Sequence, residues 1–199
     1  GFAKLDLLST SKVLVETEVI CVGNPDMPFE DYVRARVADL LTVIFYNNKF
    51  SETSRRWLKK NNLSAWNYIE RIIELKHPPA FASLLEKLKT DLEAELFDTN
   101  AELEIFLERD ETIELLEGGE LGKNLTSHYN SMALAMPKDI FEIASRAARD
   151  VGGDMFEKLV TADLSESIPA LNKEDAADQY MARRLKVEKP KNNADLAMH

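Results

Sequence analysis

The sequence has one cysteine and three histidines in 199 residues, and this scarcity argues against a metal centre or a disulfide framework within the chain. His77, His128 and His199 form no HxxH or HExxH pattern, and Cys21 has no second cysteine to pair with. Zinc and iron–sulfur sites need several such ligands at short spacings. We therefore expect no metal ion and no cluster in this chain alone, and we interpret Cys21 as a small buried hydrophobic residue of a strand.

Long apolar runs and an excess of positive charge are also missing. No apolar run is long enough to cross a bilayer, and no basic then apolar leader opens the chain. The net charge is −10 and is uneven: residues 1–76 carry +1, residues 77–127 carry −9 and residues 128–199 carry −2. Because phosphate binding requires positive charge, we expect neither nucleic acid nor an acidic membrane as a partner, and we place the protein in the cytoplasm.

Helical periodicity is what the sequence has in abundance, and it predicts an all-α fold: an irregular bundle of six to eight helices with one short N-terminal β-strand. The strongest signal follows Gly23-Asn24-Pro25, where Asp26 or Met27 can cap a helix that has Pro28 in its first turn. Six apolar residues then recur at helical spacing and are predicted to be buried: Val33, Val37, Leu40, Leu41, Ile44 and Phe45. This helix is expected to be covered on more than one side.

The later helices are predicted from the same periodicity at residues 51–61, 65–75, 80–108, 137–153, 154–164 and 173–187. Ser51 and Ser64 are placed to cap the first two of them. The apolar face predicted for the second consists of Trp66, Ile69, Ile72 and Ile73. Residues 80–108 form one helix or two that meet near Asp98, and the acidic residues that follow are expected to form a loop.

Glycines mark the clearest boundary in the chain, at Gly118, Gly119 and Gly122. They precede no Lys-Ser or Lys-Thr pair, so they do not indicate a phosphate-binding loop. The predicted division begins with a lead-in and strand at 1–25, which would be the end of a core that is missing here, and continues with a helical domain at 26–117. A hinge at 118–124, C-terminal helices at 125–187 and a mobile tail at 188–199 follow. The chain begins with Gly1-Phe2 and no methionine, which suggests a piece of a longer protein.

The predicted strand runs from Val13 to Val22 and is rich in β-branched residues. Glu16 and Glu18 lie two residues apart and would share one face of it. They form either the solvated side of an edge strand or a substrate-facing pair. A lone strand leaves its backbone groups unpaired, so we expect it to pair with residues 1–8 or with a second copy in a homodimer through the strand edge.

Four cations follow one another closely in the predicted helix at 51–61: Arg55, Arg56, Lys59 and Lys60. Such a cluster can bind phosphate, but in helices it more often forms a solvated face or pairs with acidic neighbours. The strongly acidic middle of the chain supplies many of those neighbours.

One stretch of the sequence resembles a known family. The runs Glu16-Thr17-Glu18-Val19 and Phe29-Glu30-Asp31-Tyr32-Val33-Arg34-Ala35-Arg36 are similar to the segment that closes the catalytic core of cobalamin-dependent radical SAM proteins. In that family an extended piece with two glutamates is followed by a turn, an acidic pair and then a helical C-terminal region. The resemblance covers about residues 12–75, and residues 76–199 resemble nothing that we can name.

The resemblance implies a C-terminal accessory domain, which covers the open end of a catalytic barrel or binds a substrate or partner. The CxxxCxxC cluster motif and the cobalamin-binding signature of the family are missing here. The iron–sulfur cluster, S-adenosylmethionine and cobalamin are therefore expected upstream in a parent protein, with that core as a partner in cis. No catalytic residue carries over to this chain. The alternative is a self-standing helical module that binds a protein through an apolar groove and an acidic rim, and an enzyme acting alone comes third.

Overall fold

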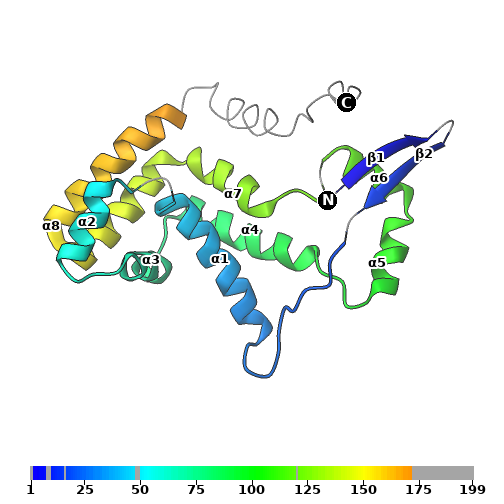
Figure 1. The fold of residues 1–199 in the computed structure, drawn as a ribbon, viewed down its shortest axis with the longest axis horizontal. Coiled ribbons are helices and arrows are strands. Elements are labelled where there is room, and N and C mark those ends of the chain that lie inside the picture. Colours follow the sequence, from blue (N-terminus) through cyan, green and yellow to red (C-terminus); the bar gives the residue numbers. More distant parts are fainter. Residues whose placement is uncertain (1, 8–9, 16, 48–49, 120, 172–199) are drawn as a thin grey trace, which may run out of the picture.

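A computed structural model describes residues 2–7, 10–15, 17–47, 50–119 and 121–171. In this part of the chain, eight helices follow a two-stranded hairpin, and they form an elongated body (Figure 1). The all-α class is confirmed. Glu16, the helix predicted at 173–187 and the tail at 188–199 lie outside the described residues.

The hairpin precedes the helices and consists of β1 (Phe2–Leu7) and β2 (Thr10–Val15), with Phe2 opposite Val15. The strand predicted from Val13 to Val22 was therefore wrong in its extent. The described residues 17–23 have no regular structure, and the described ladder ends at the pair Phe2 and Val15. Cys21 is exposed rather than buried, which corrects the prediction of a small core residue.

Helix α1 (Phe29–Phe45) buries the six apolar residues that the sequence predicted. Pro28 occupies its N-cap position and makes no side-chain cap, so the capping role predicted for Asp26 or Met27 was wrong. On the exposed side of this helix, Arg34 contacts Asp31 at 3.3 Å.

Two capped helices follow, α2 (Glu52–Lys60) and α3 (Ala65–Glu74). Ser51 accepts the N–H of Ser54, and Ser64 forms a reciprocal capping box with Asn67, so both predicted caps are confirmed. Each cap satisfies a backbone donor that the first turn leaves without a partner.

The long helical stretch after His77 is two helices, α4 (Pro79–Ala94) and α5 (Asn100–Leu107). The acidic residues beyond them were predicted to be a loop, but they form α6 (Asp110–Glu117). Its apolar residues are too few to show a periodic stripe, although Thr112 and Leu116 are buried.

Two more helices complete the described part of the chain, α7 (Leu125–Leu134) and α8 (Pro137–Leu171). Gly153 has φ 68° and ψ −168°, so it breaks α8 into two straight pieces, where the sequence predicted a stop. The second piece runs past the predicted end at Leu164 to Leu171.

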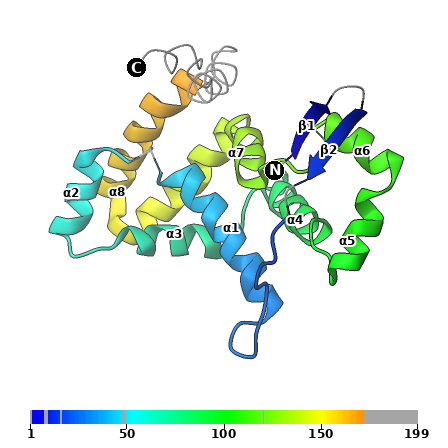
Figure 2. The same cartoon turned by 45° about the vertical axis from the view of Figure 1, so that its right-hand side comes forward.

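A single hydrophobic cluster joins α1–α4 to α7 and α8, with the helices on both sides of the glycine-rich turn in contact. Trp57 of α2 stacks on Phe156 of α8 with ring centroids 4.9 Å apart. Neither α5 nor α6 contributes to the cluster. Figures 1 and 2 agree that α2 lies at one end of the body, whereas α5 and α6, with the hairpin beside α6, lie at the other.

Candidate binding groove between α1, α3 and α4

A groove of about 490 Å³ opens between α1, α3 and α4. Small side chains, namely Ala35 and Ala38 of α1 and Ala82 of α4, lie along it. Larger apolar side chains, Leu41 and Leu85 among them, also line it. Small residues on neighbouring helices let an incoming group approach the backbone closely, so the groove can accept a bulky apolar side chain or a helix.

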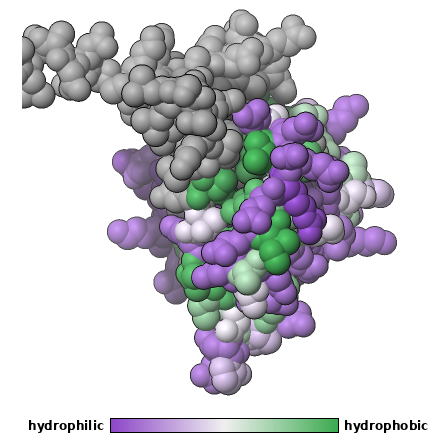
Figure 3. Space-filling view, turned by 90° about the vertical axis from the view of Figure 1, so that its right-hand side faces the viewer, coloured by the Kyte–Doolittle hydropathy of each residue, from purple (hydrophilic) through white to green (hydrophobic). Residues whose placement is uncertain are grey.

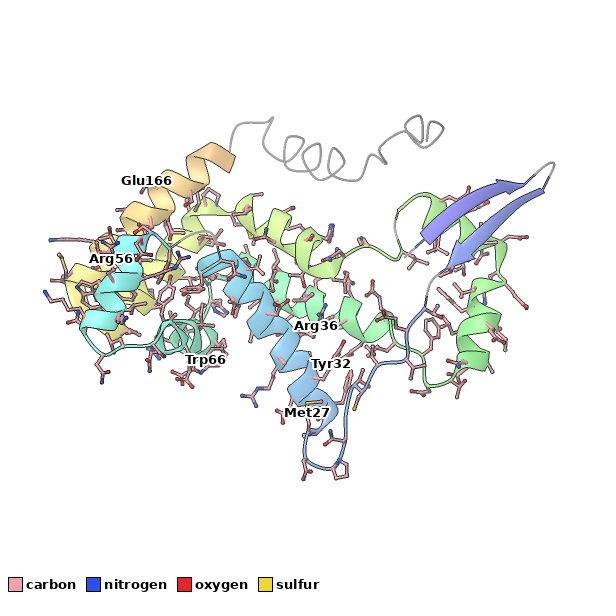
Figure 4. All side chains as sticks on the ribbon, viewed as in Figure 1. Met27, Tyr32, Arg36, Arg56, Trp66 and Glu166 are labelled. Carbon is pink, nitrogen blue, oxygen red and sulfur yellow. The ribbon has the colours of Figure 1, made fainter. Side chains whose placement is uncertain are left out.

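The α3 wall of the groove carries two apolar side chains that the sequence predicted to be core. Trp66 is 54% exposed and Ile73 is 36% exposed, so both predictions were wrong. They lie seven residues apart, which is two helical turns, and so they share a face. The opposite part of the apolar arc, with Tyr68 and Ile72, packs into the core. The apolar arc of α3 is therefore wider than its buried contact, and Trp66, which Figure 4 labels, lines the groove together with Ile73.

Ion pairs within single helices mark the two rims of the groove. On α1, Arg34 contacts Asp31 at 3.3 Å, and on α4, Lys89 contacts Glu86 at 2.7 Å. All four charges are at least one-third exposed, so these pairs contribute little to stability. Each rim is neutral overall, which favours an apolar occupant over a strongly charged one and differs from the acidic rim that the sequence suggested.

His77 also lines the groove. Its ring nitrogen Nε2 donates to the carbonyl of Ile72 at 2.9 Å, and its ring lies 5.4 Å from that of Phe81. Burial lowers the pKa of His77, and the nearby cation Arg146 lowers it further, although the bond to Ile72 works in the opposite direction. A neutral histidine here keeps positive charge away from an apolar groove.

A cluster of polar side chains lies between α1, α4 and α7, but these side chains are not arranged as a catalytic site. The hydroxyl of Tyr129 donates to Asp91 at 2.5 Å, and burial together with this carboxylate raises the Tyr129 pKa far above its usual value. Burial also raises the pKa of Glu95, with Asp91 adding to the effect, while Arg36 opposes it. Arg36 projects from α1 (Figure 4), and its Nε is buried without a hydrogen bond. A phenol held protonated is no base, and these helices place no nucleophile beside it.

Of the two glutamates proposed from sequence to face a substrate, only Glu18 lies within the described residues. Glu18 is exposed in the irregular segment, next to Val19, which is 90% exposed. Within the described ranges, no cluster of three or more histidine, cysteine or acidic side chains could hold a metal ion. Over those same ranges, no helix is both long enough and apolar enough to cross a membrane.

Sequence reasoning missed Asp163, a buried carboxylate on α8. It accepts the N–H of Ser51 at 2.9 Å and the hydroxyl of Ser54 at 2.6 Å, and so it holds the start of α2 against the second half of α8. The sequence offers one indication that Asp163 is buried: it directly precedes Leu164, an apolar residue on the core-facing side of α8. All of its contacts are structural.

No family model, curated protein or solved structure matches this chain in the comparisons. The groove therefore has to be interpreted from its own chemistry.

Proposed function

We propose that this chain is a binding domain without a catalytic centre of its own, and that an apolar-faced helix of a partner occupies the groove between α1, α3 and α4. The observation that carries the proposal is the exposure of Trp66 and Ile73 along one wall of a groove of about 490 Å³. Exposed tryptophan beside a preformed apolar groove is typical of helix-in-groove recognition, in which a few anchors supply most of the affinity.

The more specific form of the proposal is an accessory domain of a cobalamin-dependent radical SAM enzyme. It is supported by the resemblance of residues 12–75, which include α1 and α3, two of the three walls of the groove. In this form the partner helix belongs to the upstream catalytic core, and the iron–sulfur cluster, S-adenosylmethionine and cobalamin are held there. Covering such a site would exclude water from a reactive intermediate.

The test uses the polypeptide that precedes this chain in its reading frame as the probe, and titration calorimetry as the readout. Trp66→Glu and Ile73→Glu should each weaken binding by about tenfold or more, since each puts a charge into the apolar contact. Met155→Glu is the matched control, because Met155 is 58% exposed but lies on α8, outside the groove.

Equal losses in all three variants would mean that the groove is not the contact. A preceding polypeptide without a CxxxCxxC motif would remove the radical SAM form of the proposal and leave the groove to be tested with another partner helix.

A further inference from the structure

Helix α2 and the helices at the opposite end of the molecule, α5 and α6, carry opposite charge. At one end, Arg55 and Lys59 line a shallow pocket of about 400 Å³ whose apolar part includes Tyr46, Leu58 and Leu63. We call this the basic pocket. Arg55 lies over the ring of Tyr46, with its guanidinium carbon 5.8 Å from the centroid. Within the described part of the chain, neither Arg55 nor Lys59 has an acidic partner, whereas the neighbouring Arg56 is paired with Glu52 at 3.0 Å.

The opposite end is the acidic end, which we define as residues 98–118 with α5 and α6. It holds eight carboxylates and one cation, Arg109. Ile105 is 60% exposed on α5, with Glu102 and Glu108 one turn to either side of it. Figure 3 views this end and shows hydrophobic side chains set among hydrophilic ones. The acidic end thus offers an apolar side chain between two carboxylates.

These two surfaces are complementary in both charge and polarity. An apolar floor with two unpaired cations matches an apolar side chain flanked by two carboxylates, and desolvating the apolar parts would strengthen the ion pairs between them. Figures 1 and 2 place the two surfaces at opposite ends of one body, so they cannot meet within a molecule.

We propose that the basic pocket of one molecule binds the acidic end of a second copy, around Ile105. Such a contact is heterologous, because each partner uses a different surface. It leaves one basic pocket and one acidic end free on every pair, and association therefore continues head to tail instead of stopping at a dimer. This inference does not depend on the groove or on its partner.

Two charge-reversed variants test the proposal by sedimentation velocity. Arg55→Glu with Lys59→Glu disables the basic pocket, and Glu102→Lys with Glu108→Lys disables the acidic end. The wild type should form concentration-dependent species larger than a dimer, and raising the salt concentration should weaken them. Each variant alone should be monomeric, but a mixture of the two should form a one-to-one complex, since each still has one intact and complementary surface.

The control is Arg56→Glu with Lys60→Glu, which makes the same change of net charge on the same helix outside the basic pocket. It should lower the wild-type association constant by less than about threefold, against about tenfold or more for the pocket variant. Variants that each still self-associate would overturn the proposal in favour of a two-fold contact such as the strand edge. A wild type that is monomeric at all concentrations, or a mixture that forms no complex, would overturn it as well.

Discussion

At the scale of single residues, two buried tyrosines differ in the hydrogen bonding of their hydroxyl groups, and stability measurements can detect this difference. Tyr68 and Tyr129 are both fully buried, but among the described residues the hydroxyl of Tyr68 has no hydrogen-bond partner, whereas that of Tyr129 donates to Asp91. Burial of a polar group costs desolvation free energy, and without a partner no hydrogen bond offsets this cost.

Tyr68→Phe is accordingly expected to raise the free energy of unfolding by about 1 kcal/mol, and Tyr129→Phe to lower it by about 1–3 kcal/mol. Urea denaturation of the two variants beside the wild type checks both values. A loss of stability in Tyr68→Phe would indicate that an ordered water satisfies its hydroxyl.

His77 predicts a pH dependence of stability. Its pKa is lowered in the folded protein, chiefly by burial, so the unfolded chain binds the proton more readily. The contribution of His77 to the free energy of unfolding is fully present above a pH of about 6.5, the ordinary histidine pKa. This contribution is lost as the pH falls from there through the lower pKa of the folded protein.

The measurement is chemical denaturation between pH 7.5 and pH 5, roughly the span over which histidine titrates. His77→Gln keeps a donor for the carbonyl of Ile72 but cannot take up a proton, so its stability should fall less steeply than that of the wild type. Burial raises the pKa of Glu95, which works with the opposite sign, but this contribution is common to both proteins and cancels. Parallel profiles would contradict the assignment.

At the scale of elements, α1 shows what periodicity can predict. Its buried stripe is continuous, and neighbours cover it on several sides, so the apolar residues of the sequence and the buried residues coincide. Leu41→Ala should cost about 2–5 kcal/mol, the usual range for a truncation in a core. Arg34→Ala is the control and should cost well under about 1 kcal/mol, because its ion pair is exposed. Similar losses in thermal or urea unfolding would mean that the helix is rotated.

The helix α3 shows where periodicity fails. Trp66, Ile69, Ile72 and Ile73 form one apolar arc in the sequence, but the neighbouring helices cover only part of it. How much of an apolar arc is covered depends on which helices pack beside it. The sequence of the helix itself does not contain this information. The groove could not be predicted for the same reason. Likewise, the extent of the strand near Val15 depended on how many residues its partner supplies.

The bend in α8 gives a prediction about two adjacent glycines. A Cβ on Gly152 would lie 2.5 and 2.8 Å from two ring atoms of Trp57, whereas a Cβ on Gly153 would meet nothing within 4 Å. Gly152→Ala should therefore displace Trp57 and cost about 1–3 kcal/mol through crowding. Gly153→Ala should cost about 1–3 kcal/mol through backbone strain alone, because φ 68° with ψ −168° is a conformation essentially restricted to glycine.

Near-ultraviolet circular dichroism separates the two causes, since Gly152→Ala alone should change the signal of the tryptophan that stacks on Phe156. An unchanged signal in Gly152→Ala would mean that the side chains relax without moving Trp57.

At the scale of the whole molecule, the body divides into a large core and a small acidic end. The core cluster joins six helices, α5 and α6 contribute none of its residues, and the two strands of the hairpin pair with each other. Removal of residues 1–23 should then change the free energy of global unfolding by less than about 1 kcal/mol. It should, however, speed hydrogen exchange in α6, which lies beside the hairpin (Figure 2). Global destabilisation would show that the hairpin supports the core.

The strand-edge dimer stays a prediction, and Val15→Pro would remove that contact.

The two tryptophans give this protein a pair of internal optical reporters. Trp57 is stacked against Phe156 with the two rings only 7° from parallel, whereas Trp66 faces solvent. Their emission should therefore separate into a shielded component and a red-shifted component that acrylamide quenches. Occupation of the groove would alter the second component alone. A single fluorescence titration can thus report binding and folding at once, without any attached dye.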